Sequence, residues 1–270
     1  MMQLLLQTAA LFGLGFLSFP ATAQAPTGLA PTAEIRQALA PTGKLRVAFL
    51  LAGLYAIKDP ATGELKGVAV DLGNALAARL GVPSEPLSYT TPAAITQGAK
   101  LDEWDVALMG VNADRATAMD FSAPYMEVEQ GYLVRAGVAI GAASDVDKVG
   151  IRVGVLEKAG ADIYLSGVLK NATLVRTKTL GDLDALLKRD ADVIAATKTF
   201  LFDRAAGHPG SKILDGRLLV EPIGIGVPKG RNALAAEYVA KFVEEAKAAG
   251  LVKSAIDRAS LRGVAVAPFR

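Results

Sequence analysis

The amino-acid sequence predicts an α/β fold, in which strands and helices alternate along the chain. Near-continuous apolar runs such as Leu45–Leu51 are typical of parallel strands that are buried on both faces. Other stretches carry apolar residues at helical spacing, and the clearest of them runs from Ala235 to Ala246. The alternation continues through both halves of the chain, which favours helices layered on a sheet.

The composition allows a large core and excludes several functional classes. The 270 residues are 51% hydrophobic and 21% charged, with a formal net charge of +2, so one or two domains are both possible. That net charge is too small to indicate nucleic-acid binding. The sequence contains no cysteine, which excludes disulfides, thiolate catalysis and cysteine–zinc sites.

Residues 1–23 are predicted to be a signal peptide that is cleaved after Ala23 or nearby. Leu4–Phe19 is mostly apolar, and residues 21–23 form a small-x-small cleavage site. A retained membrane anchor is the alternative, but the apolar run is short for a spanning helix and contains glutamine and glycine. We therefore expect export to the periplasm.

The elements of the first half follow from local residue chemistry. Residues 24–42, rich in alanine, proline and threonine, are predicted to be a mobile arm with a short helix over Ala33–Leu39. Asp59–Gly63 has turn chemistry. Asp71 is predicted to cap a helix with three leucines on its core face, and Gly81 is predicted to end that helix.

A short helix is predicted over Ala113–Met119, with Asn112 as its N-cap. Arg115 would then lie in the first turn, where free backbone N–H groups and its guanidinium could hold an anion together. The planar guanidinium matches a carboxylate with two parallel hydrogen bonds. The alternative is an ordinary surface arginine that pairs with Asp114 or Asp120.

The remaining elements are predicted from apolar runs and helical spacing. The predicted strands are Val106–Met109, Gly131–Val134, Arg152–Leu156, Leu174–Arg176 and Val193–Ala196. A helix is predicted over Asp162–Leu169, and the next helix has its core face at Leu183, Leu186 and Leu187. Val220–Val227 contains Pro222 and is predicted to be a return crossing followed by a strand.

The stretch around Arg115 also resembles a family signature. Asn112-Ala-Asp-Arg115, followed by Met119-Asp-Phe-Ser-Ala-Pro-Tyr125, is similar to the Thr-Pro-Glu-Arg … Asp-Phe-Ser-x-Pro-Tyr signature of family 3 of the periplasmic solute-binding proteins, the polar amino-acid receptors of ABC importers. Further segments resemble that family in the same order: Gly43–Val47, Gly63–Leu72, Val153–Val155 and Asp192–Ile194. The resemblance covers roughly residues 43–262.

The resemblance implies a two-lobed α/β clamp of the type II periplasmic-binding-protein kind, with two hinge crossings. Lobe one would comprise residues 43–134 and 222–270, and lobe two residues 137–219. The hinge would then lie at 134–137 and 219–222. A solute would bind in the cleft between the lobes.

The resemblance also implies a set of ligand-binding positions. They are Ala52, Tyr55, Gly110, Asn112, Ala113, Arg115, Lys158, Ala159 and Thr197. Arg115 would anchor a ligand carboxylate, helped by N–H groups near Asn112 and Ala113. At Ala52 the aromatic residue that often covers the ligand side chain in the family is missing.

Two departures from the family pattern indicate the class of ligand. Thr197 stands where an acidic residue usually pairs with the α-ammonium group, and Lys158 replaces a small neutral residue. Because an unpaired buried charge is costly, we expect a small carboxylate other than a basic amino acid, which could lack an α-ammonium group. In the alternative, Glu127, Glu129 or another acid reaches into the cleft and restores the ammonium contact.

These observations favour the periplasmic substrate-binding component of an ABC importer. It would capture a small carboxylate-bearing solute, an amino acid or a related organic acid, by lobe closure, as a monomer that docks on a membrane permease and uses no metal or cofactor. A dehydratase-like periplasmic enzyme on the same fold, or a sensor module, is the alternative. An enzyme is not favoured, because the one histidine, His208, lies in a predicted loop without partners for a hydrolase triad or a metal cluster.

Overall fold

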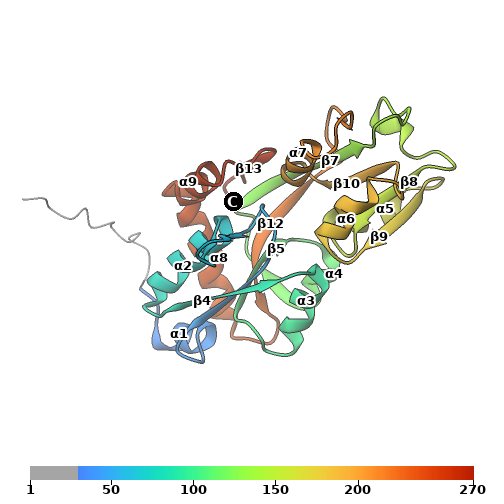
Figure 1. The fold of residues 1–270 in the computed structure, drawn as a ribbon. Coiled ribbons are helices and arrows are strands. Elements are labelled where there is room, and N and C mark those ends of the chain that lie inside the picture. The colour runs from blue at the N-terminus through green and yellow to red at the C-terminus, as the bar shows by residue number, and fades with distance from the viewer. Residues whose placement is uncertain (1–29) are drawn as a thin grey trace, which may run out of the picture.

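The protein has two lobes joined by two long strands, as a computed structural model shows for residues 30–270 (Figure 1). The predicted signal peptide, residues 1–23, lies outside the described residues, as do residues 24–29. A mixed α/β architecture with two crossings between the lobes confirms the predicted fold class.

One continuous sheet runs through both lobes, with β12 and β7 as its two central strands. The strand order is β4 (Ser84–Tyr89), β1 (Leu45–Leu50), β5 (Val106–Gly110), β12 (Leu219–Pro228), β7 (Met126–Val134), β10 (Val193–Thr197), β8 (Arg152–Leu156) and β9 (Thr173–Thr177). β1 pairs in parallel with β4 and β5, and β8 pairs in parallel with β9 and β10. β7 and β12 are antiparallel to each other and to the strands beside them, so the chain crosses between the lobes along these two strands.

Five of the helices belong to the lobe that contains the strands β4, β1 and β5, and the last of them packs on α2 and α8 (Figure 1). They are α1 (Ala33–Leu39), α2 (Val68–Leu80), α3 (Pro92–Lys100), α8 (Ala233–Ala248) and α9 (Leu251–Arg258). As predicted, Gly81 ends α2 in a left-handed conformation, with φ of 73°. The buried face of α8 includes Ala235, Val239, Phe242, Val243 and Ala246, which confirms the predicted apolar face of this helix.

Three helices cover the sheet in the other lobe. They are α5 (Gly160–Val168), α6 (Leu180–Leu186) and α7 (Lys198–Ala205). Their apolar side chains bury against β8 and β10, with Leu165 and Leu183 among the least exposed. The shorter elements are α4 (Ala113–Ala116), β2 (Ile57–Lys58), β3 (Leu65–Lys66), β6 (Met119–Phe121), β11 (Lys212–Ile213), β13 (Val264–Val266) and a 3₁₀ turn at Ala143–Asp145.

The start of α2 differs from the prediction. The helix begins at Val68, after Gly67, so Asp71 is not its cap but a first-turn residue that pairs with Arg258 at 2.7 Å. Gly67 has a φ of 140°, and a Cβ at this position would lie 2.6 Å from the carbonyl oxygen of Tyr55. The turn into α2 is therefore set by a close backbone approach, which helix-capping patterns do not reveal.

Other elements were not predicted, or their predicted limits differ from those in the structure. The helices α3, α7 and α9 were not predicted. The helix behind Asn112 ends at Ala116, because Met119 joins β6 and pairs with β12. Residues 219–228 form one uninterrupted strand, and Pro222 is tolerated within it.

Residues 33–39 form the predicted short helix, but this part of the predicted mobile arm is docked. Leu39 is fully buried, and α1 packs against α8. The carbonyl of Ala38 accepts a hydrogen bond of 2.9 Å from Arg231. The described part of the arm is thus fixed to the first lobe.

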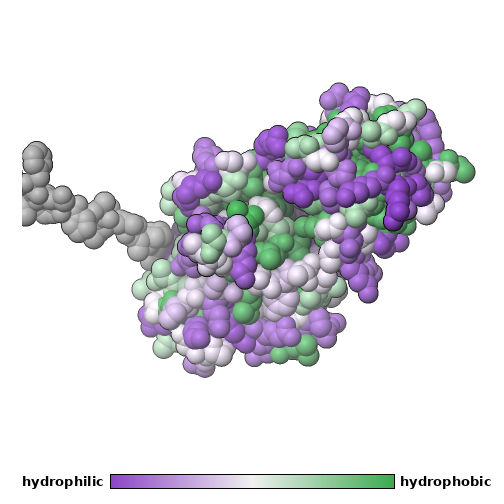
Figure 2. Space-filling model, in the orientation of Figure 1, coloured by the Kyte–Doolittle hydropathy of each residue, from purple (hydrophilic) through white to green (hydrophobic). Residues whose placement is uncertain are grey.

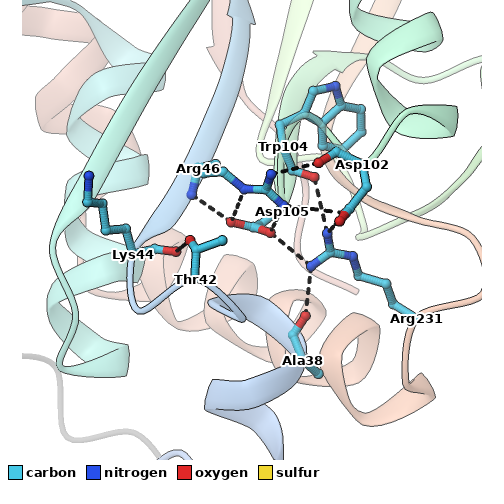
Figure 3. A network of polar contacts seen from close by, with 8 residues as sticks. All are labelled: Ala38, Thr42, Lys44, Arg46, Asp102, Trp104, Asp105 and Arg231. Atoms are coloured by element: carbon cyan, nitrogen blue, oxygen red, sulfur yellow. Dashed lines mark hydrogen bonds and ion pairs between the residues drawn. The ribbon is translucent and has the colours of Figure 1, made fainter.

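A buried carboxylate, Asp105, ties four segments of this lobe together (Figure 3). Asp105 accepts hydrogen bonds from the backbone N–H of Arg46 at 2.8 Å and from its guanidinium at 2.8 and 3.1 Å. It also accepts a hydrogen bond of 2.9 Å from Arg231, which precedes α8. Because Arg231 also holds Ala38, the network joins β1, β5, α1 and α8.

Candidate functional site

A cavity of about 360 Å³ lies between the two lobes. The first lobe contributes walls from the ends of β1 and β5 and from α3, and the second lobe contributes the ends of β8 and β10 and the starts of α5, α6 and α7. The surface in the hollow between the lobes is largely apolar (Figure 2). The apolar lining residues include Leu50, Leu54, Ile95, Met109, Leu156, Leu180 and Phe200.

Arg115 lines this cavity and is only 6% exposed. Asn112 caps the short helix α4 as predicted, because its side-chain oxygen accepts a hydrogen bond of 2.9 Å from the backbone N–H of Arg115. Among the described residues Arg115 pairs with Glu221 and not with Asp114 or Asp120, so it is not the surface pair considered as an alternative. The guanidinium instead donates to the carbonyl of Gly110 at 2.7 Å and to that of Lys158 at 2.9 Å.

The carboxylate nearest to Arg115 belongs to Glu221, on the central strand β12. Its Oε1 lies 3.7 Å from Nη1 of Arg115, and its Oε2 accepts a hydrogen bond of 2.5 Å from Gln130 on β7. Gln130 and Glu221 are diagonal neighbours across the β7–β12 pair and so share one face of the sheet. Burial raises the pKa of Glu221, although Arg115 and Gln130 act in the opposite direction.

Two glycines leave the space that Glu221 occupies. A Cβ at Gly160, the first residue of α5, would lie 2.6 Å from the Glu221 carboxylate, and a Cβ at Gly110 would overlap it. Gly110 and Gly160 come from different lobes. The carboxylate is therefore enclosed from both sides of the cleft, next to the positive N-terminal end of α5.

The other charged residues of the cavity lie toward its rim. Asp184 pairs with His208 at 2.9 Å, and Asp203 lies 3.9 Å from Arg262. His208 is thus a hydrogen-bond partner of a cavity residue. The exposed Arg204 has its guanidinium 5.6 Å from the centre of the Phe200 ring.

The structure brings five of the nine predicted ligand-binding residues to the cavity wall. These are Ala52, Tyr55, Arg115, Ala159 and Thr197. The other four, Gly110, Asn112, Ala113 and Lys158, do not line it. Gly110 and Lys158 offer their carbonyl groups to Arg115, and Asn112 caps α4. Lys158 borders smaller pockets and is not among the residues that line this cavity. That Lys158 disfavours a cationic ligand stays a prediction.

Tyr55 and Thr197 line the cavity and also interact with other groups of the protein. Burial raises the pKa of the Tyr55 hydroxyl, and the nearby Glu221 adds to that shift. Thr197 accepts a hydrogen bond of 3.4 Å from the backbone N–H of Phe200 and so caps α7. The neighbouring Lys198 bonds to Glu129 at 2.6 Å and does not line the cavity.

Sequence reasoning missed Glu221 and Gln130. The alternative that it left open was that Glu127, Glu129 or another acid reaches into the cleft; neither Glu127 nor Glu129 lines the cavity, and the acid that does so beside Arg115 is Glu221. Glu129 pairs with Lys198 and Arg217 instead. One available signal was an acidic residue inside an apolar strand, because a carboxylate among Val220 and Ile223 must find a buried partner.

The comparisons with known sequences agree on one family. The profile of the bacterial extracellular solute-binding proteins, family 3, matches residues 55–258. The ABC transporter glutamine-binding protein of Bacillus subtilis is 24% identical over 194 residues, which cover 70% of this chain and 71% of the relative. The L-arginine-binding protein of Pseudomonas aeruginosa is 27% identical over 220 residues, which cover 76% and 82%.

Solved structures resemble this fold over most of its length. A mutant of ArgBP from T. maritima is 25% identical, with a TM-score of 0.72, and the match covers 83% of this chain and 98% of that one. An ancestral arginine-binding protein bound to glutamine is 27% identical, with a TM-score of 0.70, and the match covers 80% and 97%. Within residues 30–270, no helix combines the length and the apolar character needed to cross a bilayer.

Proposed function

Because this chain belongs to family 3 of the bacterial extracellular solute-binding proteins, we propose that it is the receptor of an ABC importer and captures a small organic solute. The observation that carries the proposal is the cavity of about 360 Å³, whose walls come from both lobes. A solute in this position is enclosed when the lobes close about the two crossing strands.

The contact between Arg115 and Lys158 supports closure as the capture step. The guanidinium, on the first lobe, donates to a carbonyl of the second lobe at 2.9 Å. This hydrogen bond is made only when the lobes are together. Lobe limits at 43–134 with 222–270 and at 137–219 belong to the same proposal, with the hinge at 134–137 and 219–222.

The relatives indicate the size of the solute. They are named for binding glutamine, arginine and, with less coverage, histidine, so we propose a solute of amino-acid size. The family signature predicts that Arg115 holds the solute's carboxylate. That role stays a prediction, and a carboxylate bound there would lie near the carboxylate of Glu221, which is 3.7 Å from Arg115.

We also propose where the protein acts and with which partner. After cleavage near Ala23 it lies in the periplasm, as a monomer that delivers its solute to a membrane permease. It binds the solute without chemical turnover, and the names of the binding-protein relatives support this.

Native mass spectrometry of protein purified from the periplasm tests the proposal. We expect one adduct of amino-acid size, which disappears after unfolding and refolding in clean buffer. Adding that solute at about a hundredfold over its Kd should stabilise the refolded protein by about 2.7 kcal/mol. Failure to find an adduct, with no thermal shift across amino acids, amines and organic acids, would contradict the proposed receptor function. Conversion of a prephenate-like acid to a product would instead support the alternative, a dehydratase-like enzyme.

A further inference from the structure

Arg115 has N–H donors that no described residue uses. A guanidinium carries N–H groups on Nε and on both Nη atoms. Nη1 donates one N–H to the carbonyl of Gly110 at 2.7 Å, and Nη2 donates one to the carbonyl of Lys158 at 2.9 Å. The second N–H of each Nη and the N–H of Nε make no hydrogen bond within residues 30–270. Because Arg115 lines the cavity, these donors are available to the solute carboxylate that the family signature predicts there.

Glu221 has an acceptor that no described residue uses. Its Oε2 accepts a hydrogen bond of 2.5 Å from Gln130, whereas Oε1 accepts none within residues 30–270. Oε1 lies 3.7 Å from Nη1 of Arg115, and the side chain lines the cavity with 10% of its surface exposed. Free donors on a cation and a free acceptor on an anion thus lie beside each other in the same cavity.

The charges of this pair disfavour a solute that carries a carboxylate and no positive group. Arg115 and Glu221 balance each other. A solute carboxylate on Arg115 would add a second negative charge beside Glu221, and like charges in a buried site oppose each other. The start of α5 contributes roughly half a positive charge, which does not offset a full negative one. The solute must therefore bring its own positive group.

An α-amino acid meets this requirement with two neighbouring groups. Its ammonium group is attached to the carbon that carries the carboxylate, so a carboxylate on Arg115 brings the ammonium group close to Glu221. The ammonium group can then donate to Oε1, which completes the hydrogen bonding of a buried carboxylate. A hydrogen bond between two charged groups is also stronger than one between neutral groups.

We propose that Glu221 sets the charge requirement of the cavity: a solute carboxylate binds to Arg115 together with an adjacent ammonium group, which Glu221 receives. Glu221 is then a specificity-determining residue that a crossing strand contributes, and the solute is a zwitterion such as an α-amino acid. This inference rests on the receptor function proposed above and on the predicted role of Arg115, and it names the charge class of the solute.

Matched pairs of probes test the charge requirement. A thermal-shift screen of the common L-amino acids selects those that bind. Isothermal titration calorimetry then compares each with its desamino analogue, for example L-leucine with isocaproate, L-phenylalanine with hydrocinnamate and L-glutamine with glutaramate. We expect the amino acid to bind at least about tenfold tighter. An analogue that binds as tightly as its amino acid would overturn the inference, because a proton on Glu221 would then have replaced the ammonium group.

Substitutions assign the preference to the charge of Glu221. Glu221→Gln keeps the shape of the side chain and removes its charge. It should weaken amino-acid binding at least about tenfold without weakening the desamino analogue, whereas a merely structural defect would weaken both probes. Glu129→Gln is the matched control, because Glu129 lies outside the cavity and pairs with Lys198. An unchanged preference in Glu221→Gln would overturn the assignment.

Glu221→Asp separates charge from position. It keeps the carboxylate but withdraws it by one carbon, so amino-acid binding should weaken while the preference over the desamino analogue remains. A preference lost as completely in Glu221→Asp as in Glu221→Gln would contradict a role for the charge.

A further variant moves the carboxylate without changing the residue. Gly160→Ala introduces a Cβ that would lie 2.6 Å from the Glu221 carboxylate, so the side chain must shift and amino-acid binding should weaken. Gly167→Ala, in the same helix, meets nothing within 4 Å and serves as the control. Binding that is unchanged in Gly160→Ala would contradict a role for the observed position of Glu221.

The charge requirement and the receptor function can fail separately. A co-purified solute that has a carboxylate but no ammonium group, or an ammonium group but no carboxylate, leaves the receptor function intact and overturns the charge requirement. A protein that carries no adduct and binds no amino acid, amine or organic acid contradicts both.

Discussion

Glu221 on β12 places its Oε1 3.7 Å from Nη1 of Arg115, on the helix that follows β5, and both side chains line the cavity between the lobes. The pair couples a residue of a crossing strand to the residue that sequence reasoning marked as the anion anchor. Each charge is buried and depends on the other, because neither could be left alone at low cost. The pair is thus the centre of the site and also part of the fold.

Removing one member of this pair should destabilise the fold more than removing both. Arg115→Met leaves Glu221 buried without its counter-ion, and we expect a loss of about 3–5 kcal/mol. In Arg115→Met with Glu221→Gln no uncompensated charge remains, so at least about 1 kcal/mol should be recovered. Urea unfolding of the four proteins measures the coupling. Strictly additive losses would show that the two side chains do not interact.

The stability contribution of Glu221 should depend on pH. Its pKa is raised in the folded state above the ordinary value of 4.5, mainly by burial. The contribution of Glu221 to the free energy of unfolding is therefore full below the pKa that Glu221 has in the unfolded state. It is lost as the pH rises through the pKa that Glu221 has in the folded state. Relative to the wild type, Glu221→Gln should become more stable as the pH rises from about 4 to about 7. Urea titrations at each pH measure this difference.

Glu129→Gln provides a control of opposite sign. The hydrogen bond from Lys198 is the main cause that lowers the pKa of Glu129, so its contribution is present above the unfolded pKa and is lost on acidification. Relative to the wild type, Glu129→Gln should become less stable over the same rise in pH. The same sign of slope in both variants would contradict this assignment.

Asp105 should be among the most costly polar residues to replace in the first lobe. Its side chain is fully buried between Arg46 and Arg231, and Asp105→Asn should cost about 3 kcal/mol or more. Asp102 contacts the same two arginines but is 72% exposed, so Asp102→Asn should cost at most about 1 kcal/mol. Thermal and urea unfolding compare the variants. Similar losses in both would mean that burial does not decide the strength of this network.

Gly67→Ala should affect stability and ligand binding together. The φ of 140° suits glycine, and the new Cβ would lie 2.6 Å from the carbonyl oxygen of Tyr55, a cavity residue. We expect a loss of about 1–3 kcal/mol and weaker binding of the co-purified solute, measured by unfolding and calorimetry. Gly167→Ala should remain within about 1 kcal/mol of the wild type. Unchanged stability in Gly67→Ala would show that the turn relaxes freely.

The sequence alone determined those features that depend on neighbours along the chain. The parallel strand at Leu45–Leu50, the end of α2 at Gly81, the cap at Asn112 and the apolar face of α8 all follow from local spacing and chemistry. The family signature around Arg115 also lies within one short stretch. Such patterns survive folding, because the same few residues make the interactions that they predict.

Only the tertiary structure decided which groups Arg115 contacts. The register of β12, in which Glu221 lies opposite Val128 and Ile223 opposite Gly110, turns Glu221 toward the cavity. A shift of one residue would turn it to the other face of the sheet, and local sequence does not specify that register. The same holds for Gly160, which leaves room for the carboxylate only when the second lobe lies against the first. Which carboxylate reaches the arginine was therefore settled by strand pairing and lobe packing, both of which join residues far apart in the chain.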